Sequence, residues 1–172
     1  MVDKQPIHDI KLPQSNDKLQ FPVCLMINDD ILKAKLETRP SIDMTIVVPL
    51  GENLAYHIET LIRNIFADVI INYNGDISLS NGEIKYFIIP KLLLAEYIGP
   101  YPAWSTAKTT MTIEWKLVNK SGKNVWIETI TGSYIGKWKE GNTRYFLKET
   151  FNDLLQKSQA KMLSSKILRN LQ

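Results

Sequence analysis

The sequence is poor in the side chains that build metal and redox sites. It has one cysteine, Cys24, and two histidines, His8 and His57, among 172 residues. A single cysteine excludes an intramolecular disulfide and a zinc site made of several thiolates. Neither histidine belongs to a pair four residues apart, the spacing of helical metal sites. We therefore expect Cys24 to be a buried, inert thiol within a strand and His57 to be a surface or boundary residue.

Long apolar runs are also missing. The longest, around 21–27 and 86–94, contain Pro22, Pro90 and Lys91, and both fall short of the roughly 18 apolar residues that predict a membrane-spanning helix. The segment 1–6 is largely polar and does not have the pattern of a signal peptide. Two interpretations stay open: a cytosolic protein, or a chain that follows a removed export signal.

Catalytic motifs are not recognisable either. There is no glycine-rich phosphate loop, and Ser133 between Gly132 and Gly136 has the wrong spacing for a nucleophile elbow. Asp29 and Asp30 together can contact a cation, but adjacent acidic residues are more typical of a turn. We therefore expect no catalytic residue, no metal and no cofactor, and predict that the protein is not an enzyme.

The charge is too balanced to indicate nucleic-acid binding. Twenty-one Lys and Arg against 18 Asp and Glu leave a formal net charge of +3, and the pI near 8.9 permits only weak attraction to anionic surfaces. Glu149 and Asp153 interrupt the basic residues of the last predicted helix, which also lacks the interleaved aromatic residues of a stacking platform. We interpret these basic residues as a solvated face: Lys148, Lys157, Lys161, Lys166 and Arg169.

What is present is a pattern of short strands and two helices. We predict a flexible lead-in or tether over 1–20 and a single α+β domain over 21–172, in the order β-β-β-α-β-β-β-β-α. The sheet is expected to be mostly antiparallel, with both helices packed on one face. The predicted strands are 21–27, 31–38, 44–48, 68–73, 84–89, 109–118 and 125–134, and the predicted helices are 52–66 and a long last helix capped by Asn142 or Thr143.

The first helix shows one apolar stripe. Gly51 or Asn53 can cap it, and Glu59 and Arg63 lie four residues apart on its polar side. Apolar residues recur at spacings of three and four, which predicts a helix docked on a core. These residues are Leu54, Ile58, Leu61, Ile62 and Ile65.

The last two strands form the clearest hairpin. Apolar and polar residues alternate from Thr109 to Val118, which places Met111, Ile113, Trp115 and Leu117 on one face. An even loop length brings Trp126 and Ile130 to the face of Trp115, and Gly132 is expected to mark a weak point or a bulge. We expect Trp115 and Trp126 to pack in the core or across the hairpin.

One loop combines aromatic residues with glycine and proline. Tyr97, Tyr101 and Trp104 flank Gly99-Pro100-Tyr101-Pro102, and such aromatics on a stiff loop are suited to contact a partner. The alternative is that Tyr97 and Trp104 anchor the loop to the core. The preceding residues, 91–97, can extend the strand past Pro90.

Four segments together resemble a known family. Phe21-Pro22-Val23-Cys24-Leu25-Met26-Ile27 is its opening strand, and the helical segment Pro49–Leu61 leads into Asp68-Val69-Ile70-Ile71. Long strands follow, and then the helix Phe146–Leu155. Over about 21–160 this layout resembles small bacterial envelope lipoproteins of the YajG type. It is also similar to the lipoprotein partner of the lipopolysaccharide-assembly barrel.

The resemblance implies a non-enzymatic domain in the periplasm, held at the outer membrane by a lipidated N-terminal cysteine and binding an envelope protein or glycolipid. It carries over no catalytic residues. The chain departs from this pattern because Cys24 follows Phe21-Pro22-Val23 and not the small residues of a lipidation box, so the anchor would have to precede residue 1. The alternative is a cytosolic α+β domain that binds a small apolar ligand or nucleic acid. The partner and the oligomeric state stay open.

Overall fold

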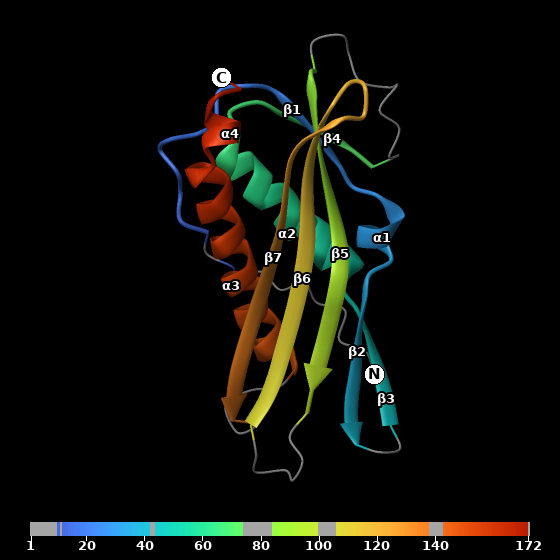
Figure 1. The fold of residues 1–172 in the computed structure, drawn as a ribbon. Coiled ribbons are helices and arrows are strands. Elements are labelled where there is room, and N and C mark those ends of the chain that lie inside the picture. The colour runs from blue at the N-terminus through green and yellow to red at the C-terminus, as the bar shows by residue number, and fades with distance from the viewer. Residues whose placement is uncertain are drawn as a thin grey trace.

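The computed structural model is an α+β fold built on one mixed sheet. It describes residues 10, 12–41, 44–73, 84–99, 106–137 and 143–171, without the side chains of 37–41, 44–47 and 143. Within these residues the sheet has seven strands, and two longer helices lie on one side of it (Figure 1). The helices are α1 (Asp29–Leu32), α2 (Gly51–Ile65), α3 (Thr143–Ser164) and α4 (Lys166–Arg169).

Three long antiparallel strands form the main part of the sheet: β5 (Tyr86–Ile98), β6 (Thr106–Asn119) and β7 (Asn124–Lys137). The edge of β5 that faces away from β6 pairs with two strands that run parallel to it. These are β1 (Val23–Met26) and, further along β5, β2 (Lys35–Ser41). The two outer strands of this half are β4 (Val69–Asn72), parallel to β1, and β3 (Met44–Pro49), antiparallel to β2. The predicted order of strands and long helices is confirmed, with α1 and α4 added.

The short helix α1 replaces the predicted turn at 28–30 and the first residues of the strand predicted over 31–38. Asn28 is its N-cap, and its side-chain oxygen accepts a hydrogen bond from the backbone N–H of Ile31. Asp29 forms an ion pair with Lys33 at 2.6 Å. The prediction was wrong here because an alternating pattern over a few residues fits a strand as well as a helical turn. In the structure Ile31 is the buried residue of α1 and is 0% exposed.

Strand β5 continues through Pro90, as the extension considered for 91–97 requires. A proline is normally excluded from a central strand because it cannot donate to the ladder. Among the described strands, however, only β6 pairs with β5 at this point. β1 pairs with it as far as Ile88, β2 begins to pair at Glu96, and α1 contacts β5. Because neither β1 nor β2 pairs with β5 at Pro90, the missing N–H removes no ladder hydrogen bond on that edge of β5. The register shift lies later, between Leu92 and Leu94.

Helix α2 buries the stripe that the sequence predicts. Leu54, Ile58, Leu61, Ile62 and Ile65 are all 0% exposed. On the polar side Arg63 pairs with Glu59 at 2.8 Å, as expected.

The start of α2 differs from the prediction. Its N-cap is Leu50, which provides no side-chain hydrogen bond, and Gly51 is the first helical residue. A Cβ at Gly51 would lie 1.8 Å from the backbone oxygen of Leu32. Glycine is therefore needed for the close approach of α1, and it does not act as the cap. The cap residue Asn142 suggested for α3 lies outside the described residues.

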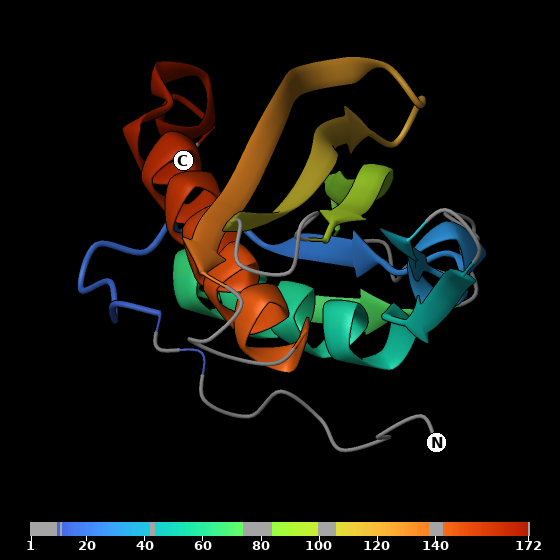
Figure 2. The ribbon, with the colours of Figure 1, turned by 90° about the horizontal axis from the view of Figure 1, so that it is seen from below.

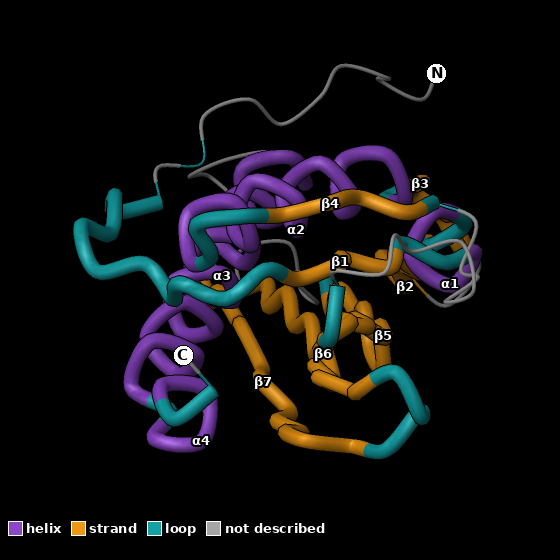
Figure 3. The backbone as a smooth tube through the Cα atoms, turned by 90° about the horizontal axis from the view of Figure 1, so that it is seen from above, coloured by secondary structure: helices purple, strands orange, loops and turns teal. Residues whose placement is uncertain are grey.

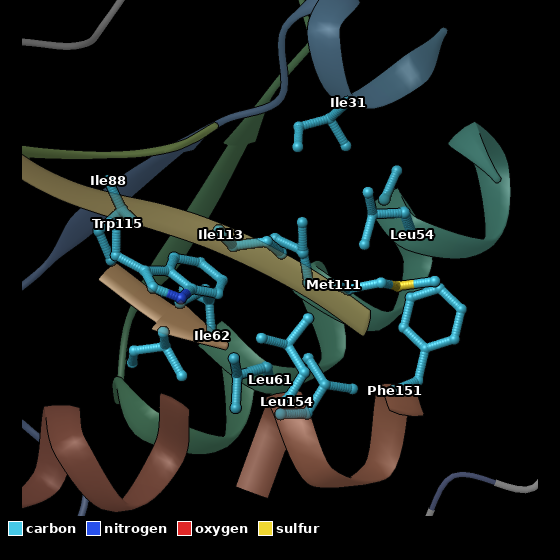
Figure 4. Packing of buried hydrophobic residues seen from close by; sticks show 14 of the residues in the cluster. Ile31, Leu54, Leu61, Ile62, Ile88, Met111, Ile113, Trp115, Phe151 and Leu154 are labelled. Atoms are coloured by element: carbon cyan, nitrogen blue, oxygen red, sulfur yellow. The ribbon is translucent and has the colours of Figure 1, made fainter. Parts of the chain in front are cut away.

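The core lies between the inner face of β5–β7 and the helices α2 and α3. Figure 4 shows Met111, Ile113 and Trp115 of β6 facing residues of both helices. Trp115 is completely buried, and Trp126 is 7% exposed. Both tryptophans therefore lie in the core, and the pairing of Leu117 with Trp126 puts the two strands in the predicted register.

Helix α3 packs very closely against β7 at Gly132. A Cβ at Gly132 would lie 2.5 Å from the backbone nitrogen and the Cβ of Leu154. The expected weak point or bulge is therefore wrong: the only register shift between β6 and β7 lies between Leu117 and Val118. Gly132 has no side chain because the helix occupies that space.

Part of the segment before β1 also packs on the domain. Leu19 is 1% exposed, its N–H donates to the carbonyl of Ile65, and its carbonyl accepts from the N–H of Ala67. Further upstream, the Gln159 side chain donates to the carbonyl of Pro13 at 2.7 Å. Leu19 therefore belongs to the core, whereas the role of 1–20 as a tether stays a prediction.

Candidate binding surfaces

The face of β5–β7 that points away from α2 and α3 is not covered by a helix in the described residues (Figures 2 and 3). We call this surface the outer face. Its register rows join Ile98 of β5 to Lys108 of β6 and Ile135 of β7. A second row, near the other end, joins Ile89, Lys116 and Ile127. Between these rows the face carries mostly hydroxyl side chains: Thr110, Thr112, Thr129, Thr131 and Ser133.

Several large aliphatic side chains on this part of the sheet are exposed to solvent. Ile135 is 60% exposed and Ile98 is 52% exposed. Leu93 and Leu94 are also exposed where the register shifts in β5. Single exposed aliphatic residues are common, but several on one face of a sheet mark a surface that can bind a partner.

A second, smaller apolar cluster lies at one end of the outer face. It contains Cys24, Met26, Phe87 and Val118, together with Ile84. Cys24 is 1% exposed, and burial raises the pKa of its thiol. The predicted buried thiol is therefore confirmed, because β1 lies inside the sheet with neighbours on both sides.

A groove of about 480 Å³ lies at the β7 edge of the sheet, where α3 ends and α4 begins. One wall is the first part of β7, and the other is the C-terminal end of α3 with α4. Figure 3 shows β7 beside α3 at one end and farther from α3 at the other end, where α4 also contacts β7. The lining residues are Val125, Trp126, Ile127, Glu128, Lys161, Ser164, Ser165, Lys166 and Ile167.

The charges at this groove are predominantly basic. Lys161 pairs with Glu128 at 3.3 Å, which balances the only acidic lining residue. Lys166 is exposed and is the second basic lining residue. Ile127 and Ile167 are 45% and 51% exposed and give the groove an apolar component.

The structure places the three predicted contact residues differently. Tyr97 is 3% exposed, and its ring meets Phe146 at 5.9 Å in an edge-to-face arrangement. Burial also raises the pKa of its hydroxyl group. Tyr97 therefore anchors the end of β5 in the core. Tyr101 and Trp104 lie outside the described residues, so a contact surface formed by this loop stays a prediction.

His57 is buried and not a surface or boundary residue. It is 3% exposed on α2, and its ring lies 5.4 Å from that of Phe151 on α3. The expectation failed because the sequence shows that α2 has a face toward the sheet but not that α3 covers a neighbouring face. Packing of α3 on α2 encloses His57.

The described residues hold no group of three or more His, Cys, Asp or Glu side chains that could bind a metal ion. Nor does any helix in these parts of the chain have the length and hydrophobicity needed to cross a membrane. An enclosed apolar pocket near Trp126 and Met162 has no room for a water molecule.

The sequence indicated the outer face but not the groove. Alternation along 109–118 already separates Thr110 and Thr112 from the core residues, so the polar side of β6 was visible. The groove depends on where α3 ends relative to β7. Its two walls are formed by residues about 40 positions apart in the sequence, so no local pattern records it. Ser165, the N-cap of α4, is the only local signal of the end of α3.

Comparison with known proteins shows the fold. No family model matches the sequence, and no curated protein matches it. A Xanthomonas campestris protein of the family DUF330 is similar in structure, with a TM-score of 0.57 and 13% identity over 99% of this chain and 94% of that chain. PelC from Paraburkholderia phytofirmans, solved as a dodecamer, has a TM-score of 0.50 and 16% identity over 90% and 93%.

A more distant similarity is to lipoprotein GNA1162 from Neisseria meningitidis, with a TM-score of 0.44 and 12% identity over 84% of this chain and 99% of that chain. Similarity at this level carries no argument about function. The first two similarities establish that this α+β arrangement also occurs in other bacterial proteins. Membership of the YajG type stays a prediction.

Proposed function

We propose that this chain is a non-enzymatic domain of the bacterial cell envelope, held at the outer membrane by a lipid anchor that precedes residue 1, and that it acts by binding a protein or glycolipid partner. The observation that carries the proposal is the outer face of β5–β7. Three long strands present hydroxyl groups and exposed aliphatic side chains on one continuous surface. Such a surface offers both hydrogen bonds and apolar area to a partner.

The chain's layout supports the envelope location. The order of elements and the four segments quoted above resemble small envelope lipoproteins, and the fold is shared with the DUF330 protein and PelC. Because PelC was solved as a dodecamer, a second copy of this chain is among the protein partners to be tested.

The location is tested by fractionation. The complete gene, with any segment that precedes residue 1, is expressed in its own host with a C-terminal tag. We expect the product in the membrane fraction of the envelope, and we expect it to be released when a cysteine of the preceding segment is replaced by serine. Recovery of the unaltered product in the cytosolic fraction contradicts the envelope proposal.

The outer face is tested with Ile98→Asp and Ile135→Asp, which place a charge on exposed positions of two different strands. Self-association is followed by light scattering, and glycolipid binding is followed by co-sedimentation with lipopolysaccharide vesicles. We expect both variants to lose binding while melting like the parent protein. Tyr56→Asp, at a position 58% exposed on α2, is the matched control and should keep binding.

The predicted loop is tested in the same assays. Tyr101→Ala should weaken binding without changing the melting temperature if the loop contacts the partner. A clear drop in melting temperature, with binding lost only through unfolding, favours the alternative of a core-anchored loop. If the parent protein neither self-associates nor binds the vesicles, and a photo-crosslinker placed at Ile135 captures no envelope protein in the host, the proposed function is wrong.

A further inference from the structure

In the part of the chain that the structure describes, side chains of α3 bond to the edge of β7 along only half of its length. At Ser133 the backbone N–H donates to the carboxylate of Asp153 on α3 at 2.9 Å. At Thr131 the carbonyl accepts from the ammonium group of Lys157 at 3.4 Å. Lys157 and Asp153 also pair with each other at 2.6 Å. Two side chains of α3 therefore bond to two of the main-chain groups on this half of the edge.

The same geometry identifies which main-chain groups of the other half point away from the sheet. In an antiparallel pair, residues alternate between those bonded to the partner strand and those whose N–H and C=O point outward. Because Thr131 and Ser133 point outward, and no register shift occurs between Trp126 and Lys137, Thr129 and Ile127 also point outward. The short contact between the hydroxyl groups of Thr112 and Thr131, 2.9 Å, fits a pair of this type.

Helix α3 does not cover these two residues. Near the C-terminal end of α3, Lys161 forms an ion pair with Glu128, and the chain then turns at Ser165 into α4. The groove of about 480 Å³ begins there, and Ile127 is one of its lining residues. An edge with outward N–H and C=O groups is a template for another strand.

We propose that this groove binds an extended, acidic segment of a partner polypeptide as an added strand on β7. Thr129 and Ile127 supply the main-chain hydrogen bonds, and Lys166 faces a carboxylate of the bound segment. From Val125 to Thr129 the edge is about 13 Å long at about 3.3 Å per residue, which suits about five residues of partner chain. This mode of recognition obtains affinity from the main chain and specificity from alternate side chains.

The charge of the groove argues for an acidic segment. Its only carboxylate, Glu128, is already paired with Lys161, which leaves the ammonium group of Lys166 for an incoming carboxylate. Alternate side chains of an added strand point to opposite faces. One set would contact the exposed Ile127 and the other would lie toward α4, where Ile167 is exposed.

The test uses a fluorescein-labelled hexapeptide of alternating valine and glutamate, followed by fluorescence anisotropy. We expect saturable binding, and weaker binding of the matched peptide of alternating valine and lysine. Thr129→Pro removes one outward N–H without removing a bond to β6 and should weaken binding about tenfold. Lys166→Glu should weaken it about threefold or more. Lys91→Glu, on an exposed position of the outer face, is the control and should bind like the parent.

Two further measurements keep the test decisive if Thr129→Pro does not fold. A peptide of the same sequence with N-methylated backbone at alternate residues should not bind the parent protein. Amide hydrogen exchange should slow at Thr129 and Ile127 when the unmethylated peptide is added. Equal binding of the methylated peptide, equal binding of the valine–lysine peptide, or no binding at millimolar concentration overturns the proposal.

A self-associated parent protein that Thr129→Pro converts to monomer also overturns it, because the edge would then be occupied by a second copy. The groove is separate from Ile98 and Ile135, so the proposal goes beyond the proposed function. Failure of the peptide test leaves the outer-face experiments unaffected, and failure of those experiments leaves the groove unaffected.

Discussion

The indole N–H of Trp115 donates a hydrogen bond to the hydroxyl of Ser158 at 3.2 Å, and both residues are completely buried. The Ser158 hydroxyl in turn donates to the carbonyl of Leu154 at 2.8 Å. This bond joins the middle of β6 to α3 within the core. The bond ties the position of the helix along the strand to the position of Ser158.

Replacing Ser158 with alanine should leave the Trp115 N–H buried without an acceptor. We expect the free energy of unfolding to fall by about 1–3 kcal/mol. Urea denaturation measures the change, and Ser164→Ala is the control, since the Ser164 hydroxyl donates to a carbonyl at the solvent-exposed end of the same helix. If both variants unfold at the same urea concentration, the Trp115–Ser158 bond contributes nothing to stability.

Leu61→Asp tests the docking of α2. Leu61 is 0% exposed in the centre of the core, so an aspartate there buries an unpaired charge or must be protonated. We expect a loss of more than about 4 kcal/mol, which would leave the protein largely unfolded at 25 °C. Circular dichroism and thermal melting measure this, with Tyr56→Asp on the exposed side of α2 as the control. A Leu61→Asp protein that melts like the parent shows that α2 is not docked.

Gly132→Ala tests the close contact between β7 and α3. The new methyl group would lie 2.5 Å from the backbone nitrogen of Leu154, which is much closer than van der Waals contact. The backbone cannot move aside as a flexible side chain can. We expect destabilisation of about 1–3 kcal/mol. Ser133→Ala, one residue along the same strand, keeps the backbone hydrogen bond to Asp153 and should be nearly neutral. An unchanged melting temperature for Gly132→Ala would show that the helix lies farther from the strand.

The thiol of Cys24 should make stability depend on pH. Burial raises its pKa in the folded state, so the folded protein holds the thiol proton more tightly than the unfolded chain. The stability that the protonated thiol contributes is fully present below the pKa of the unfolded chain, about 8.5. It is lost as the pH rises toward the pKa of the folded protein. We expect the parent protein to lose more stability between pH 7 and pH 9.5 than Cys24→Ala does, as measured by urea denaturation.

The control for the pH experiment is Leu25→Val, which changes another buried residue of β1 that packs in the main core and not in the cluster of Cys24. Its stability should fall with pH as much as that of the parent protein. If Cys24→Ala also shows the full pH dependence, the thiol is not the group responsible. Rapid reaction of the native thiol with a maleimide at pH 7 would likewise contradict its burial.

Local patterns were sufficient to predict most elements. The spacing of Leu54, Ile58 and Leu61 predicts α2, and alternation along 109–118 predicts β6 and its inner face. These predictions succeed because amphipathic periodicity is a property of neighbouring residues. The same kind of pattern predicted a strand at Ile31, where the structure has the helix α1. A buried helical turn and a buried strand have similar residue patterns over a few positions.

The sequence by itself determined the fold class, the order of the strands and long helices, and the burial of Cys24. Only the tertiary structure decided the burial of His57, the close approach at Gly132, and the half-covered edge of β7. The physical reason is that each of these depends on the position of α3 relative to elements far away in the sequence. Residue spacing records which face of a helix is apolar, but not where along a strand that helix lies or where it stops covering the edge.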